Sequence, residues 1–118
     1  MDQALKAASD GEKRIILVFQ GSDWCAPCMK LDREIWSQDS FIEYANEHYI
    51  MVKADFPRKK ANALPAEQQE KNNAMAEKYN EHGYFPFVVV LDKDGKILGE
   101  TSYLHRSVED YIALIDAF

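Results

Sequence analysis

The sequence predicts a single α/β domain over residues 1–118, with a central mixed four-stranded sheet and helices on both of its faces. The first observation is the apolar run in Arg14–Phe19, which is typical of a strand buried on both faces. The second is that a helical pattern and another strand follow, an order that implies a right-handed crossover and a parallel strand pair. The third is a pair of strands around the turn Asp92–Gly95, which predicts a terminal antiparallel hairpin.

Each element has a local signal. The first helix is expected to stop at Asp10-Gly11, and Asp39-Ser40 is expected to cap the third helix. Pro65 suits the first turn of the fourth helix, and Ser107 with Asp110 resembles a capping box at the start of the last one. The expected helices are Asp2–Ser9, Trp24–Trp36, Phe41–His48, Pro65–Tyr79 and Ser107–Phe118, and the expected strands are Arg14–Phe19, Tyr49–Asp55, Phe87–Leu91 and Lys96–Thr101.

Composition excludes several classes of function. The chain of 118 residues is 47% hydrophobic, so it can bury a core without help from disulfides or metals. Its net charge of -6 argues against nucleic acid as a partner, because phosphate binding needs a basic face. The longest apolar run, Ile15–Phe19, is too short to span a bilayer, so we expect no membrane insertion. We expect a monomer.

The two cysteines of the chain, Cys25 and Cys28, lie where the first strand gives way to a helix. The free N–H groups and the dipole at a helix start favour a thiolate at the first cysteine. The second cysteine lies one turn later, within reach of a disulfide. We therefore expect Cys25 to be an exposed nucleophile and Cys28 a more buried resolving thiol, with Pro27 restricting the turn between them.

Other uses of the cysteine pair fit the sequence less well. A zinc site needs four ligands, and the three histidines, His48, His82 and His105, are scattered without the usual spacing. A structural disulfide across so small a loop would stabilise the fold little. Two inert core cysteines are less expected beside Trp24 at a turn. We therefore predict no metal and no cofactor other than a redox-active disulfide.

The motifs "WCAPC", "VKAD" and "GYFPFVVVLDKDGKIL" together resemble the thioredoxin superfamily over nearly the whole chain. The longer lead-in "GSDWC" is most similar to the C-terminal domain of membrane thiol:disulfide interchange reductases. The resemblance implies a thioredoxin fold, thiol–disulfide exchange by Cys25 and Cys28, and a cis peptide between Phe85 and Pro86. It also implies that Trp24, Phe85 and Pro86 contact substrate, the backbone before Pro86 pairing with the substrate chain as an added strand.

Topology supports this placement of the proline independently of the resemblance. The cysteine motif follows the carboxyl end of the first strand, and Pro86 stands at the start of Phe87–Leu91. If these two strands run antiparallel, Pro86 and the two cysteines lie at the same edge of the sheet.

Three departures from the family pattern affect the site. Ala26 replaces the commoner glycine, and this residue, with Pro27, supports the active-site turn and helps to set its redox balance. The family's buried acid should fall at Val18 or Phe19, and neither is acidic. Lys53 therefore lacks its usual acidic partner, and we expect it to reach solvent. Asp23 and Glu34 are weak substitutes for the missing acid, because charged residues on turns and helices are usually solvated.

The third departure is an insertion over residues 56–73. Its first part, Phe56–Leu64, leaves the second strand on the active-site edge. It either shapes the substrate groove or is a solvated insertion, and the sequence leaves both open. His82 is expected to be a surface residue.

The sequence thus favours a thiol–disulfide oxidoreductase that is a reductase rather than an oxidant. Its expected partners are protein disulfide substrates and a thiol-donating partner protein. The alternatives are a binding or chaperone-like module with little redox turnover, and a thiol carrier of metal. The first residues show no signal peptide, which favours the cytoplasm, whereas the resemblance favours a periplasmic or otherwise exported protein with its leader removed.

Overall fold

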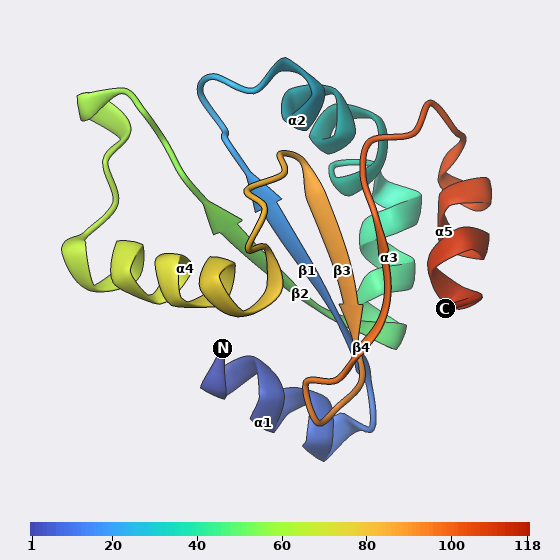
Figure 1. Ribbon diagram of the computed structural model, residues 1–118. Coiled ribbons are helices and arrows are strands. Elements are labelled where there is room, and N and C mark those ends of the chain that lie inside the picture. Colours follow the sequence, from blue (N-terminus) through green and yellow to red (C-terminus); the bar gives the residue numbers. More distant parts are fainter.

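A four-stranded mixed sheet forms the centre of the computed structural model, which describes residues 1–118 (Figure 1). The strands lie in the order β2-β1-β3-β4. β1 pairs in parallel with β2 and antiparallel with β3, which pairs antiparallel with β4. This is the predicted sheet. The strands are β1 (Arg14–Gln20), β2 (Tyr49–Asp55), β3 (Phe87–Leu91) and β4 (Ile97–Thr101).

The central position of β1 and β3 explains their apolar sequences. Ile15–Phe19 and Val88–Leu91 are buried on both faces of the sheet. The register places Phe19, near the end of β1, opposite Phe87 at the start of β3 and Ala54 near the end of β2. The carboxyl ends of β1 and β2 therefore meet the amino end of β3 at one edge of the sheet.

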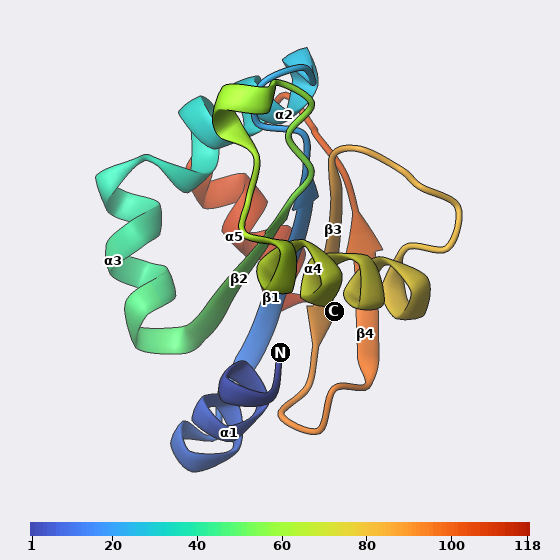
Figure 2. The same cartoon turned by 90° about the vertical axis from the view of Figure 1, so that its left-hand side faces the viewer.

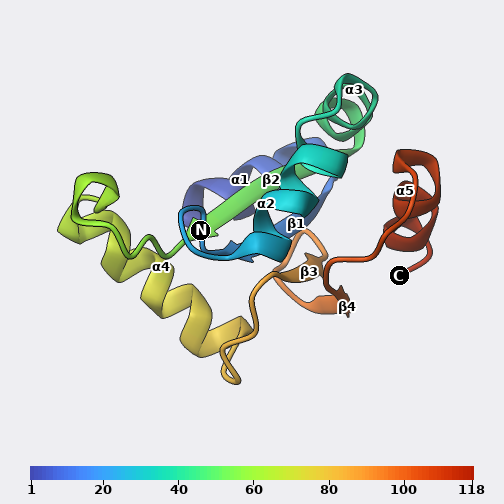
Figure 3. The same cartoon turned by 90° about the horizontal axis from the view of Figure 1, so that it is seen from above.

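Helices cover both faces of this sheet (Figures 1 and 3). One apolar cluster joins the sheet to α2, the π-helical turn η1, α3 and α5, and a second joins it to α1 and α4. The helices are α1 (Asp2–Gly11), α2 (Ala26–Leu31), η1 (Asp32–Trp36), α3 (Asp39–His48), the 3-10 turn η2 (Lys60–Asn62), α4 (Ala66–Tyr79) and α5 (Val108–Asp116). None of these helices has the length and apolarity that crossing a membrane requires.

Three local expectations about helices are wrong. The first helix does not stop at Asp10-Gly11 but runs through Gly11. Asp39-Ser40 does not cap α3, because Asp39 is already helical, Gln38 holds the cap position, and no side chain caps this end. The helix after the cysteines does not stay α-helical to Trp36. Its last turn is a π-helix, Asp32–Trp36, whose wider turn lets the consecutive side chains Ile35 and Trp36 both face the core.

The start of α5 follows the expected pattern. Ser107 is its N-cap residue, and the Ser107 hydroxyl oxygen accepts a hydrogen bond of 3.1 Å from the N–H of Asp110. Tyr111 and Ile115 of α5 are fully buried against the sheet.

Candidate active site

A tight turn carries the chain from β1 into the cysteine motif. The N–H of Cys25 donates to the carbonyl of Gly21 at 2.9 Å. A Cβ atom at Gly21 would collide with the indole ring of Trp24, so this position has room only for glycine. The small residue thus lets Trp24 fold back over the turn directly before the first cysteine.

Cys25 and Cys28 form a disulfide at the start of α2, with their Cα atoms 5.2 Å apart. Cys25 is the N-cap residue of α2, and its sulfur accepts a hydrogen bond of 3.3 Å from the N–H of Cys28. The N–H of Gly21 points at the Cys28 sulfur from 3.5 Å. Pro27 lies in the first turn, where its missing N–H removes no helical hydrogen bond.

The expected difference in exposure between the two cysteines is wrong for this disulfide form. Cys25 is 5% exposed and Cys28 3% exposed. The physical reason is that the Cys25 sulfur is turned inward, toward the Cys28 sulfur to which it is bonded and the N–H of the first helical turn.

The residues before β3 lie beside the cysteine turn, as the topology predicted. The peptide bond between Phe85 and Pro86 is cis, and Pro86 is buried. The Phe85 ring meets the Trp24 ring edge-on, with centroids 5.4 Å apart. The carbonyl of Pro86 accepts a hydrogen bond of 2.6 Å from the hydroxyl of Ser102.

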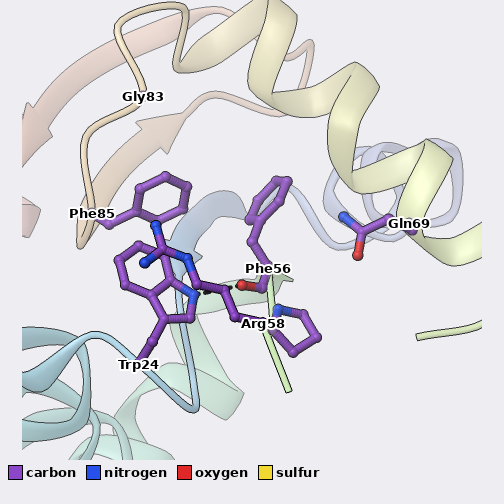
Figure 4. A pocket seen from close by; sticks show the side chains of 7 residues that line it. Trp24, Phe56, Arg58, Gln69, Gly83 and Phe85 are labelled. Carbon is purple, nitrogen blue, oxygen red and sulfur yellow. Dashed lines mark hydrogen bonds between the residues drawn. The ribbon is translucent and has the colours of Figure 1, made fainter. Parts of the chain in front are cut away.

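The insertion loop, Phe56–Leu64, packs against the same turn (Figures 2 and 4). The indole N–H of Trp24 donates to the carbonyl of Phe56 at 2.7 Å. The Phe56 ring meets the Phe85 ring edge-on at 5.4 Å. A surface pocket of about 640 Å³ opens between the loop and the turn, lined by Trp24, Phe56, Pro57, Arg58, Gln69, Gly83 and Phe85. The first residues of the loop thus form a wall of this pocket, while residues 58–63 are exposed to solvent.

Asp23 attaches the insertion loop to the cysteine turn. Its carboxylate accepts hydrogen bonds from the backbone N–H groups of Arg58 and Lys59 at 2.9 and 3.0 Å, and from the Asn62 amide at 3.1 Å. The N–H of Arg58 is the largest cause that lowers the pKa of Asp23 from its ordinary value of 3.8. Asp23 is therefore a loop-binding carboxylate, a role that the sequence did not indicate.

An acid and a lysine lie beside Cys28. A pocket of about 260 Å³ is lined by Gln20, Ser22, Cys28, Met29, Asp32 and Lys53. The ammonium of Lys53 lies 3.3 Å from a carboxylate oxygen of Asp32. Lys53 is exposed, as expected, and lacks an acid on β1, but it has another acidic partner in Asp32. Asp32 follows Cys28 by four residues, so both lie on the same side of the helical segment, and this spacing was the available signal.

The other candidates from the sequence lie elsewhere. Both carboxylate oxygens of Glu34 accept hydrogen bonds of 2.9 Å from the Tyr103 hydroxyl, and one lies 3.3 Å from His105. His82 is exposed beside Glu81. No group of three or more histidine, cysteine, aspartate or glutamate side chains is placed to hold a metal ion.

Sequence comparison identifies relatives of the whole chain. The profile of a family described as "Thioredoxin-like domain" matches residues 1–118. The Chlamydia pneumoniae protein named disulfide bond reductase DsbH is 38% identical over 101 residues, which are 86% of this chain. The match takes in 59% of that protein, so this chain spans less than two thirds of its relative.

Solved structures agree with this assignment. A structure described as DsbH oxidoreductase matches with a TM-score of 0.90 at 33% identity, covering 98% of this chain and 78% of that one. The oxidised C-terminal domain of Neisseria meningitidis DsbD matches with a TM-score of 0.64 at 18% identity, covering 98% of this chain and 90% of that domain. The second match shows a shared fold. This chain belongs to the thioredoxin-like domain family, and Cys25 and Cys28 form a disulfide at the start of α2.

Proposed function

We propose that this domain reduces disulfides in other proteins, cycling between a Cys25/Cys28 dithiol and the disulfide seen here. The observation that carries the proposal is the placement of this disulfide at the start of α2, beside Trp24 and the Phe85-Pro86 peptide. The similarity to a protein named disulfide bond reductase supports the same direction of electron flow.

The first step is attack by the Cys25 thiolate on one sulfur of a substrate disulfide. A Cys25–substrate disulfide forms, the substrate S–S bond breaks, and the second substrate sulfur leaves as a thiolate that takes up a proton. The N–H of Cys28, which points at the Cys25 sulfur from 3.3 Å, favours the anionic form of the attacking sulfur.

The second step is attack by Cys28 on the Cys25 sulfur. This forms the Cys25–Cys28 disulfide and releases the second substrate thiolate, so that two electrons have passed to the substrate. Cys28 must lose its proton to attack. Asp32, which lines the same pocket and is held by Lys53, accepts that proton in place of the acid missing from β1.

Three residues form the substrate contact. Trp24 shields the disulfide from one side, and the backbone of Phe85 before Pro86 pairs with an extended substrate chain. Ala26 and Pro27 hold the turn that separates the two cysteines. Pro86 is buried at the start of β3, where it fixes the position of Phe85 beside Trp24.

The reaction needs no cofactor besides the cysteine pair. Its electrons come from the dithiol of a partner protein, which reduces the Cys25–Cys28 disulfide by the same exchange. We propose a monomeric single domain that works outside the cytoplasm, in an oxidising compartment where a disulfide reductase has substrates.

Two cysteine variants test the proposed function. We expect Cys25→Ser to abolish reduction of insulin disulfides, because the attacking sulfur is lost. We expect Cys28→Ser to accumulate covalent mixed disulfides with substrate, detected by non-reducing gel electrophoresis and mass spectrometry, because the second step is blocked.

The wild-type chain serves as the active control. Full insulin reduction by Cys25→Ser would refute the mechanism. A redox titration of the wild type that shows no reversible dithiol would instead support the alternative of a binding or chaperone-like module.

A further inference from the structure

Positive charge is concentrated on the insertion loop beside the active site. Phe56–Leu64 contains Arg58, Lys59 and Lys60 and no acidic residue, whereas the whole chain has a net charge of -6. The ion pairs of the structure all involve other residues. The carboxylate of Asp23 contacts this loop, but it does so through backbone N–H groups and the Asn62 amide. A basic segment without side-chain ion pairs on an acidic protein is a feature that complementary negative charge on a partner would explain.

Arg58 is the cation of this loop that faces the pocket. Its guanidinium carbon lies 3.7 Å from the centroid of the Trp24 ring, and Figure 4 shows the two planes facing each other. This stacking fixes one face of the guanidinium and leaves its N–H groups without any partner in the structure. The group is therefore ordered and has free hydrogen-bond donors.

The backbone position of Arg58 is set by hydrogen bonds that do not involve its guanidinium group. Asp23 holds the backbone N–H groups of Arg58 and Lys59, and the Trp24 indole N–H holds the carbonyl of Phe56. Asp23 and Trp24 are the two residues before Cys25. The cysteine turn thus positions the loop, and a group bound by Arg58 lies beside Trp24, the residue before Cys25.

We propose that the pocket bounded by Trp24, Phe56, Arg58 and Phe85 binds an acidic side chain of the substrate next to its disulfide, with Arg58 as the specificity-determining residue. This rests on the proposed function. The occupant is an aspartate or glutamate side chain, because a carboxylate matches the planar pair of donors that a guanidinium presents. The aromatic walls contact the methylene groups of that side chain. Asp23 is a positioning residue.

The test uses three short peptides that differ only in the residue flanking their cysteine, which is glutamate, glutamine or lysine. Each peptide is used as its disulfide-linked dimer. The second-order rate constant of reduction by the pre-reduced protein is divided by the rate constant with dithiothreitol. This division removes the effect of the flanking charge on the peptide thiol itself. For the wild type, we expect the glutamate dimer to react about fivefold faster than the glutamine dimer, as for a solvent-accessible ion pair.

Variants separate the pocket from the general charge of the loop. Arg58→Gln should reduce the glutamate-to-glutamine ratio to about one, and Arg58→Glu should favour the lysine dimer. Lys60→Gln removes the same charge from a loop residue that does not line the pocket, and it should keep most of the preference. Asp23→Asn should weaken the preference while leaving the cation in the chain. Because the ratio compares the rate constants of the same variant with two peptides, a change in the overall rate of that variant does not affect it.

Some outcomes would overturn the inference. A wild-type ratio of one, or an unchanged ratio in Arg58→Gln, would show that Arg58 does not read the substrate. Equal loss of the glutamate preference in Lys60→Gln and Arg58→Gln would show that the overall positive charge of the loop sets the preference, and not the pocket at Arg58. If no dimer were reduced at all, the proposed function would fail, and this result differs from uniform reduction of all three dimers.

Discussion

The surroundings of Asp32 support its proposed role as proton acceptor for Cys28. It lines the pocket beside Cys28, and its carboxylate is held 3.3 Å from the Lys53 ammonium. Val18 and Phe19, where the family would place an acid on β1, are buried and apolar. In the proposed cycle, the proton acceptor for Cys28 thus comes from the helical segment that follows the cysteines, with a partner on β2.

Replacing Asp32 by asparagine should slow the second step and spare the first. We expect release of substrate from the mixed disulfide to slow about tenfold, a modest general-base effect because the carboxylate is partly exposed. Rapid acid quenching followed by mass spectrometry measures the fraction of mixed disulfide over time.

A matched variant controls for charge. Asp39→Asn removes the same charge from an exposed position in α3 and should leave the time course unchanged. If Asp32→Asn leaves the pH dependence of the second step unaltered, Asp32 is not the acceptor.

The sequence identified site residues whose signals are local, and missed those whose partners are distant. Cys25 and Cys28 are three residues apart, and Pro86 directly precedes a recognisable strand. The partners of Asp23 lie 35 or more residues away on the insertion loop. Their pairing depends on how β2 delivers the loop to the turn, which no short pattern encodes. Asp32 had the right spacing to Cys28, but its pairing with Lys53 depends on how the helix lies beside β2.

At the scale of elements, the left-handed residue that ends α1 lies one position after the glycine that was expected to end it. Gly11 was expected to stop this helix, yet α1 runs through Gly11, and Glu12 takes the left-handed conformation with φ of 52°. The N–H groups of Glu12 and Lys13 bond back to the carbonyls of Ser9 and Ala8. This is the Schellman arrangement, in which glycine is the favoured residue at the left-handed position.

We therefore expect Glu12→Gly to stabilise the protein by about 0.5–1 kcal/mol, because glycine adopts this conformation without steric cost. The midpoint of urea unfolding measures the change. Glu12→Ala removes the same charge but keeps a Cβ atom at the left-handed position, so it should give no such gain. Equal midpoints for the two variants would mean that the conformation of this residue costs nothing.

The elements themselves were predictable to different degrees. β2 and β3 have the expected bounds because periodicity and apolar runs mark strands well. The π-helical turn Asp32–Trp36 was not predictable, because an α-helical pattern fits the same residues. Its widening depends on packing of Trp36 against Phe41 and Tyr111, which come from other parts of the chain.

At the scale of the whole molecule, one carboxylate joins three elements. Asp116 at the end of α5 accepts hydrogen bonds from the hydroxyls of Tyr44 on α3 and Tyr49 on β2, the second at 2.5 Å. The bond to Asp116 is the main cause that raises the pKa of Tyr44 to about 12. Burial is the main cause that raises the pKa of Tyr49, and Asp116 adds to it. A raised tyrosine pKa contributes stability that is complete below pH 10 and is lost as the pH rises through the folded-state value.

Asp116→Asn should weaken the hydrogen bonds that join α5 to α3 and β2, and so destabilise the protein. We expect a loss of about 1 kcal/mol at neutral pH, because hydrogen bonds to a charged acceptor are replaced by weaker ones at a partly exposed site. An absorbance titration at alkaline pH should show tyrosine ionisation moving toward the ordinary value of 10. Asp94→Asn, on the exposed turn between β3 and β4, is the control and should leave the titration as in the wild type. An identical titration for Asp116→Asn would contradict the assigned cause.

The separation of the two tryptophans has a practical consequence for optical work. Trp24 stacks with Arg58 and directly precedes the Cys25–Cys28 disulfide, whereas Trp36 is buried in an apolar cluster, against Phe41 and Tyr111. Because a disulfide can quench the emission of an adjacent indole, we expect Trp24 to fluoresce more strongly once the cysteines are reduced, whereas Trp36 should report on the core. A Trp36→Phe variant would leave Trp24, beside the cysteine pair, as the single tryptophan of the chain. Its emission should then follow the redox state of the cysteines without any attached dye.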